Sequence, residues 1–245
     1  MKTNTKDDSQ IAHFARTSED WWTQDGPFAP LHKLNPCRIG FLREQIDSHF
    51  GLARESRTPM KGLSIVDIGC GGGLVCEPLS RLGAKVTGVD ADEQAICVAA
   101  QHSANQGLDI TYMAGAAEDL VAAKKTYDVV LALEIVEHVA DVEGFTKLCA
   151  SLLKPGGLLI LSTLNRTWKS YALGIVVAER IIRWVPAGTH EWQRFLKPSE
   201  LAKLVRASGL ELQDVRGMVY NPLKKCFSLS PSDLDVNYFL VAKKP

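Results

Sequence analysis

The chain lacks an excess of either charge, a regular cysteine framework and a long apolar run. Its 245 residues include 28 Lys and Arg against 28 Asp and Glu, so no overall basic field favours a nucleic-acid partner. The six cysteines form no Cys-x-x-Cys pair, which is typical of reduced thiols in a cytosolic protein rather than of disulfides or a zinc site. A spanning helix needs about 20 apolar residues, and Glu179, Arg180 and Arg183 interrupt the longest candidate. We therefore expect a cytoplasmic chain that is soluble or lies on a membrane surface.

From about Leu63 onward, short β-branched runs alternate with amphipathic helical patterns. This alternation predicts an α/β fold in which helices cover both faces of a mostly parallel, Rossmann-like sheet. The seven expected strands are residues 63–69, 84–90, 109–113, 127–133, 157–163, 210–218 and 235–243. We expect a single domain over residues 1–245, with a cap of about 60 residues that includes a helix from Pro36 to Phe50.

A glycine-rich turn follows the first predicted strand. Residues 69–73 read Gly-Cys-Gly-Gly-Gly and precede a helical pattern, where a backbone can approach a ligand and offer free N–H groups. Asp90 lies 21 residues beyond Gly69, at the end of the second strand, where a carboxylate can accept bonds from both ribose hydroxyls. Leu74 occupies the third glycine position of a dinucleotide fingerprint, so that fingerprint is broken. An adenosyl sulfonium, which has no phosphate, suits this turn better, and a turn without any ligand is the plain alternative.

These residues resemble a known superfamily, and further stretches resemble one family within it. Residues 66–73 and 88–90 look like the first two motifs of class I S-adenosylmethionine-dependent methyltransferases, with residues 115–119 similar to their adenine-side segment. The chain resembles the ubiquinone-biosynthesis O-methyltransferases over nearly its whole length, from about residue 12. The stretches that carry this closer resemblance are residues 16–22, 30–38, 134–138, 162–166, 186–190 and 235–238. The resemblance implies that Arg38, Gly69, Asp90 and Leu133 bind S-adenosylmethionine.

The family resemblance also implies the reaction. A methyl group would pass to a phenolic oxygen of a polyprenylated catechol, and later of a demethylated ubiquinol. Because the sulfonium methyl is already activated, the protein has to align oxygen, methyl and sulfur and to deprotonate the phenol. A phenol of pKa near 10 is a poor nucleophile at neutral pH, so a base or a cation is required. The expected partners are the substrate, an anionic membrane surface and other ubiquinone-biosynthesis enzymes, with no nucleic acid.

The candidate catalytic and metal-binding groups are three residues that follow the fourth strand. If a helical turn begins there, Glu134 faces Glu137 and His138, and the three side chains can hold a divalent ion that acidifies the phenol. The resemblance supports this metal-dependent interpretation, with Mg²⁺ the first choice. Alternatively, His138 is a metal-free general base that Glu137 orients, or the Glu-His pair merely caps a helix.

Several other features leave alternatives open. Trp21 and Trp22 either close over the cofactor or quinone ring as a lid or staple the N-terminal segment to the core. His190 is a candidate for contact with the substrate head group, or a solvated loop histidine. The competing functions are a catechol or quinone methyltransferase of other specificity, C-methylation included, and a non-catalytic module that binds adenosylmethionine or lipid.

An unusual segment, residues 165–194, follows the fifth strand. On a helix of about 100° per residue, residues 168–185 place an apolar arc of about 200° opposite Lys169, Arg180 and Arg183. The arc consists of Leu173, Trp184, Val177, Ile181, Val185, Tyr171, Ile182 and Ile175. A basic amphipathic helix with interfacial aromatics suits attachment to the inner membrane, where a polyprenyl substrate dissolves. A core helix with a solvated charged side is the alternative.

Overall fold

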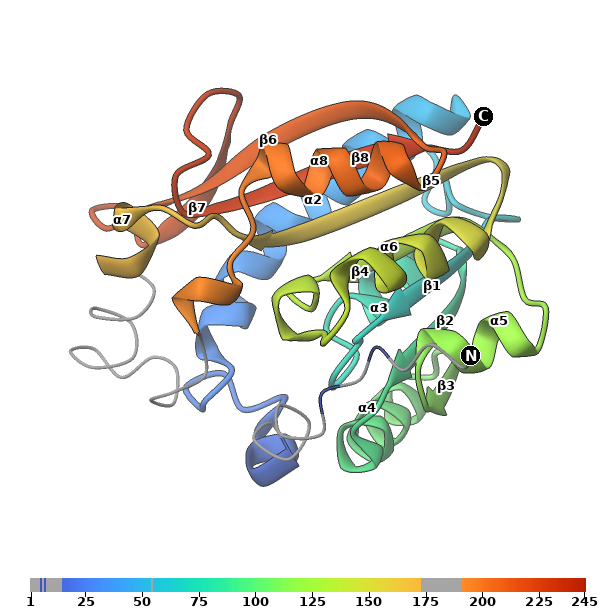
Figure 1. The fold of residues 1–245 in the computed structure, drawn as a ribbon. Helices are drawn as coiled ribbons and strands as arrows, with labels where there is room; N and C mark the ends of the chain where they lie inside the picture. Colours follow the sequence, from blue (N-terminus) through green and yellow to red (C-terminus); the bar gives the residue numbers. More distant parts are fainter. Residues whose placement is uncertain (1–4, 6, 8–14, 54, 173–190) are drawn as a thin grey trace.

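The computed structural model describes residues 5, 7, 15–53, 55–172 and 191–245. These residues build an eight-stranded sheet of order β3-β2-β1-β4-β5-β8-β6-β7 (Figure 1). The strands are β1 (Ser64–Ile68), β2 (Lys85–Asp90), β3 (Ile110–Ala114), β4 (Tyr127–Leu133), β5 (Leu153–Leu164), β6 (Glu211–Asn221), β7 (Cys226–Ser230) and β8 (Asn237–Lys243). The strands from β3 to β5 pair in parallel, and β8, β6 and β7 extend the sheet through antiparallel pairs. The predicted mostly parallel α/β fold is confirmed.

The predicted number of strands is wrong by one. The structure adds β7, which pairs antiparallel with β6 at the edge of the sheet, for example Met218 with Leu229. This strand has only five residues and stays partly exposed. An edge strand has one paired neighbour and one open side, so its short sequence carries less hydrophobic signal than a central strand does.

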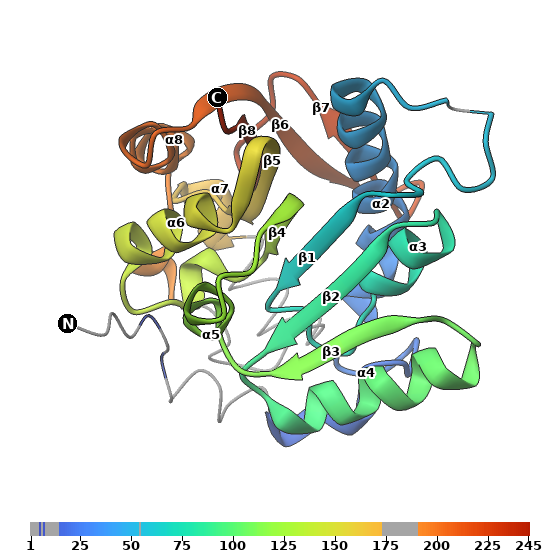
Figure 2. The same cartoon turned by 90° about the vertical axis from the view of Figure 1, so that its right-hand side faces the viewer.

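Helices cover both faces of the sheet, as predicted (Figure 2). On one face, α2, α3 and α4 pack over a core that includes Phe41, Leu79 and Ile96. On the other face, α5, α6 and α8 pack over a core that includes Leu120 and Phe145. The helices are α2 (Ala29–Phe50), α3 (Cys76–Arg81), α4 (Glu93–Asn105), α5 (Ala117–Ala122), α6 (Val142–Ser151), α7 (Trp168–Ser170) and α8 (Pro198–Ala207), with 3-10 turns η1 (Ala15–Asp20), η2 (Val136–His138) and η4 (Trp192–Arg194).

Helix α2 is longer than the sequence suggested. It begins at Ala29 rather than at Pro36, with Pro30 in the first turn, where a missing N–H costs no helical hydrogen bond. Pro36 lies inside the helix instead. Gly51 ends it in the left-handed conformation at φ 63°, which glycine adopts without a Cβ clash. Helix α8 also has a proline, Pro198, in its first turn.

The sheet topology places a binding edge at the carboxyl ends of β1 and β4. The chain runs from β1 outward to β2 and β3, and then returns to the other side of β1 as β4. Open α/β sheets bind ligands at such a reversal of strand order, outside the carboxyl ends of the strands. Within the described residues, no helix is both long enough and apolar enough to cross a bilayer.

Candidate active site

The glycine turn lies at the carboxyl end of β1 and is tied to β2. Gly69, Gly71 and Gly73 all have positive φ, and a Cβ on Gly69 would lie 2.3 Å from Cδ1 of Ile135. The positive φ therefore favours glycine at Gly69, and a larger residue would also force the Ile135 side chain to move. The Gly71 N–H donates to Oδ2 of Asp90 at 2.8 Å, so the turn and the end of β2 form one rigid unit.

Asp90 is a half-buried carboxylate with remaining acceptor capacity. Its Oδ1 accepts from the Asp92 N–H at 2.9 Å, and its Oδ2 accepts from Gly71. Burial raises the pKa of Asp90, and these backbone donors oppose that rise. A carboxylate offers about four lone-pair sites, so two further hydroxyl donors can be accepted.

The N-terminal segment packs directly on the glycine turn. A Cβ on Gly71 would lie 2.3 Å from Cζ2 of Trp21, so the indole ring rests on the turn's backbone. The Trp22 Nε1–H donates to the Gly72 carbonyl at 2.9 Å, and its ring stacks on His102 with centroids 3.5 Å apart. These contacts join the cap to the core, and they also place Trp21 over the turn where a lid would lie.

Arg38 of α2 is a buried cation beside three carboxylates. Its residue is 5% exposed, and burial lowers its pKa while the charges of Glu134, Asp67 and Glu137 partly offset that effect. Its Nε and Nη2 atoms have no hydrogen-bond partner among the described residues. These two nitrogens form one edge of the guanidinium plane, the edge that binds a carboxylate through two parallel hydrogen bonds.

Glu134 is held rigidly at the end of β4. Its backbone is left-handed at φ 55°, an uncommon conformation for a residue other than glycine and one that turns the chain sharply after Leu133. The Ser162 hydroxyl of β5 donates to Oε1 at 2.5 Å. The Asn237 amide of β8 donates to Oε2 at 2.8 Å.

Glu137 lies on the following 3-10 turn and is 3% exposed. Its Oε2 accepts from the Thr163 hydroxyl at 2.7 Å, whereas its Oε1 is buried without a partner in the described part of the chain. Burial, and then the nearby charge of Glu134, raise the pKa of Glu137 to about 8. Asp67, at 2% exposure, has its pKa raised to about 7, mainly by burial and against the attraction of Arg38. The edge thus concentrates buried carboxylates around one arginine.

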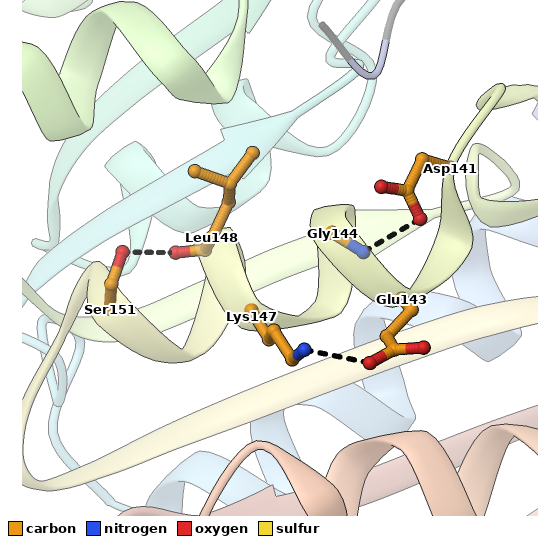
Figure 3. Close-up of a pocket in the computed structure, with 6 residues that line it drawn as sticks. All are labelled: Asp141, Glu143, Gly144, Lys147, Leu148 and Ser151. Carbon is orange, nitrogen blue, oxygen red and sulfur yellow. Dashed lines mark hydrogen bonds and ion pairs between the residues drawn. The ribbon is translucent and has the colours of Figure 1, made fainter. Parts of the chain in front are cut away.

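A surface hollow of about 440 Å³ on α6 does not belong to this site (Figure 3). Its polar groups satisfy one another along the helix. Asp141 accepts from the Gly144 N–H at 2.9 Å, and Lys147 pairs with Glu143 at 2.7 Å. These are cap and i,i+4 interactions, which stabilise a helix.

Comparison with known proteins identifies the family. Residues 41–215 match a family model described as a methyltransferase domain. The chain is 49% identical over 247 residues to a ubiquinone biosynthesis O-methyltransferase of Dinoroseobacter shibae, with 100% of both chains covered. It is 46% identical over 241 residues to the Sinorhizobium medicae protein of the same name, with 98% of this chain and 97% of that one covered.

The chain belongs to the ubiquinone biosynthesis O-methyltransferase family. Solved structures support its fold. A possible histamine N-methyltransferase from Thermotoga maritima superposes with a TM-score of 0.64 at 19% identity, covering 95% of this chain and 98% of that one. Magnesium protoporphyrin IX methyltransferase from Synechocystis, solved with bound S-adenosylhomocysteine (SAH), gives 0.59 at 21% identity, over 85% and 82% of the two chains.

The structure of this methyltransferase brings the predicted cofactor residues to one edge. Gly69 follows β1, Asp90 ends β2 and Leu133 ends β4. Arg38 of α2 lies at the same edge, close enough to its carboxylates for their charges to act on it. Their roles in binding remain predictions.

The predicted metal ligands are only partly brought together. Glu134 lies close enough to Glu137 for its charge to raise the pKa of Glu137. His138 is half-buried on the same turn, and its backbone N–H donates to the Ile135 carbonyl. Across the residues that the structure describes, no three His, Cys, Asp or Glu side chains gather as metal ligands. His190 and residues 173–190 of the predicted amphipathic helix lie outside the described residues.

Sequence reasoning missed the groups that hold the two glutamates. Ser162, Thr163 and Asn237 lie in stretches that resemble the family, yet no role was predicted for them. Their side chains bind the two carboxylates from β5 and β8.

Proposed function

We propose that this methyltransferase transfers the methyl group of S-adenosylmethionine to phenolic hydroxyls of polyprenylated catechol and demethylubiquinol intermediates of ubiquinone synthesis, at a membrane surface. The observation that carries the proposal is that Arg38 and Glu137 lie at one sheet edge. Among the described residues, two nitrogens of Arg38 and one carboxylate oxygen of Glu137 have no hydrogen-bond partner. The names of the full-length relatives support the substrate class.

The residues at the carboxyl edge fit the proposed cofactor. The free edge of Arg38 suits the carboxylate of the methionine moiety, and Asp90 suits the ribose hydroxyls. The glycine turn lets the backbone approach closely. Bound S-adenosylmethionine supplies an activated methyl group, so the chain's own residues have to orient the phenol and remove its proton.

Glu137 is our candidate for the group that accepts the phenolic proton. Its Oε1 has no partner among the described residues, and Thr163 fixes the other oxygen. A base with a pKa of about 8 is better matched to a phenol of pKa about 10 than an ordinary carboxylate is. Ser162 and Asn237 keep Glu134 in place beside it.

A divalent ion fits this edge as a two-carboxylate site. Mg²⁺ is commonly held by one or two carboxylates, with water and substrate oxygens completing its shell. Glu134 and Glu137 would hold it, and the Oε1 of Glu137, which has no partner among the described residues, would then be a metal ligand instead of the base. Bound Mg²⁺ would lower the pKa of a coordinated phenol. Nothing in the geometry adds His138 to these two ligands.

The described start of the unusual segment supports a surface location. Trp168 is 77% exposed and stacks on Trp192 with ring centroids 5.4 Å apart. Tryptophan is enriched where protein meets the membrane interface, because its ring is amphipathic. An exposed tryptophan that stacks on a half-buried one beside the carboxyl edge suits an enzyme whose substrate tail stays in the bilayer.

The proposal is tested by methyl transfer from labelled S-adenosylmethionine to three acceptors. We expect polyprenyl catechol and demethylubiquinol to be methylated on oxygen in the presence of vesicles, and a short-tailed catechol more slowly. Mass spectrometry locates the methyl group. Parallel assays test the two-carboxylate metal site. We expect EDTA to abolish turnover and added Mg²⁺ to restore it. Methylation on a ring carbon, or methylation of the short-tailed catechol alone, would contradict the proposed function and indicate a methyltransferase of another specificity.

Cofactor binding is expected to alter the environment of Trp21. Because this ring rests on the glycine turn, a ligand that enters there changes the ring's contacts and its fluorescence. We expect titration with SAH to change the emission of the wild type and to produce a much smaller change in Trp21→Phe. Trp168→Phe, which replaces an exposed indole away from the turn, is the control. Equal changes in all three proteins would place the cofactor elsewhere.

A further inference from the structure

Two large apolar side chains are highly exposed in the described part of the chain, and they follow strands that end on the same side. Trp168 is 77% exposed and comes four residues after β5, and Leu223 is 93% exposed and comes two residues after β6. Both β5 and β6 pair antiparallel with β8, so they run in the same direction. Both side chains therefore lie beyond the carboxyl edge, where the candidate active site is found.

Leu223 lies at the tip of a firmly built hairpin. The Asn221 side-chain oxygen accepts from the backbone N–H groups of Leu223 at 3.0 Å and Lys224 at 3.1 Å. Behind the tip, the rings of Tyr220 and Phe227 pack with centroids 5.0 Å apart. The turn thus holds Leu223 away from the core.

The hairpin tip is basic as well as apolar. Lys224 and Lys225 are both exposed, and the sequence from Val219 to Ser230 contains no acidic residue. The nearest acidic pair along the chain, Asp233 and Asp235, is occupied by Lys169, at 3.0 and 3.2 Å. An exposed leucine between an aromatic residue and two lysines has the composition of a membrane-interface contact.

We propose that the hairpin tip, residues 222–225, is a second membrane contact that binds anionic lipid. Leu223 enters the boundary of the acyl chains, and Lys224 and Lys225 meet the headgroup phosphates. The inference rests on the proposed function at a membrane surface, and it deepens that function by fixing orientation. A contact after β6, together with one after β5, turns the carboxyl edge toward the bilayer, from which a polyprenyl ring enters. Two linked contacts also bind a surface more tightly than either contact alone.

Vesicle sedimentation of the full chain tests the hairpin. The probes are vesicles of phosphatidylcholine alone and vesicles with about one quarter phosphatidylglycerol. We expect Lys224→Gln/Lys225→Gln to weaken binding to the anionic vesicles at least about tenfold, since each lysine near such a surface contributes severalfold. Leu223→Ser is expected to weaken it by a similar factor. The matched control is Lys124→Gln/Lys125→Gln, an exposed lysine pair between α5 and β4, at the opposite edge of the sheet.

The outcomes separate this inference from the function on which it rests. Circular dichroism and turnover of a short-tailed catechol are expected to be the same in all variants. If wild type and hairpin variants sediment equally on anionic vesicles, the hairpin contact is wrong and the surface location stands. If the wild type does not sediment at all, the surface location and the hairpin contact both fail, whereas methyl transfer to the short-tailed catechol still reports on the chemistry.

Discussion

Replacing Arg38 with lysine is expected to raise the Kd for S-adenosylmethionine about 10- to 100-fold. The guanidinium edge offers Nε and Nη2 together, and neither has a partner in the described structure. A lysine keeps the positive charge among the surrounding carboxylates but binds a carboxylate through a single point, losing one charge-assisted hydrogen bond worth about 1.5–3 kcal/mol. Isothermal titration calorimetry with S-adenosylmethionine and SAH measures the change.

The control for Arg38→Lys is Arg43→Lys on the same helix. Arg43 has a side chain 38% exposed and pairs with Asp47 at 3.3 Å. We expect this variant to bind both ligands as the wild type does. Unchanged affinity in Arg38→Lys, with both variants folded, would show that the free edge of Arg38 does not bind the cofactor.

Replacing Glu137 with glutamine is expected to lower kcat about 100- to 1000-fold with little change in the Kd for S-adenosylmethionine. General-base catalysis by a positioned side chain commonly contributes about this factor, and glutamine preserves the shape without accepting a proton. Steady-state kinetics with polyprenyl catechol measures the loss. The variant His138→Gln tests the alternative, in which His138 is the base. In that case the loss of kcat would be larger in His138→Gln than in Glu137→Gln.

The same substitution has a distinct effect on stability. The folded pKa of Glu137, about 8, lies above its ordinary value of 4.5, so the folded state holds the proton more tightly than the unfolded state. This group therefore makes folding less favourable as pH rises between these two values. In the metal-free protein, Glu137→Gln is expected to have a Tm close to that of the wild type near pH 4, where the side chain of Glu137 is protonated in both states, and a clearly higher Tm than the wild type at pH 9.

Glu143→Gln is the matched control for both measurements. Glu143 is exposed on α6 and pairs with Lys147. We expect its kcat and its Tm at both pH values to remain close to those of the wild type. A wild-type kcat in Glu137→Gln would remove this carboxylate from the catalytic step.

Local patterns predicted the elements that are defined by their own sequence. The central strands were found because β1 and β4 are mostly buried and mostly apolar. The glycine turn and Asp90 were found because their chemistry depends on residue type at a fixed spacing. The start of α2 was missed, because both Pro30 and Pro36 are compatible with a first helical turn and local rules do not choose between them. Packing of Leu34 into the core decides for the earlier start.

Local sequence patterns could not predict which side chains bind Glu134 and Glu137. Ser162 and Asn237 are 28 and 103 residues away from Glu134, and they reach it only because β4, β5 and β8 are neighbours in the sheet. The position of Glu137 beside Glu134 was expected, but through an α-helical turn. The left-handed Glu134 and a 3-10 turn place it there instead, and His138 does not join a three-ligand group.

Complementation of a bacterium that lacks its own ubiquinone O-methyltransferase tests the proposed function most directly. Quinones and their precursors are extracted and quantified by liquid chromatography with mass spectrometry. We expect this chain to restore ubiquinone and Glu137→Gln to accumulate polyprenyl catechol instead. Accumulation of catechol with the wild-type chain, expressed, folded and able to bind S-adenosylmethionine, would contradict the proposed function.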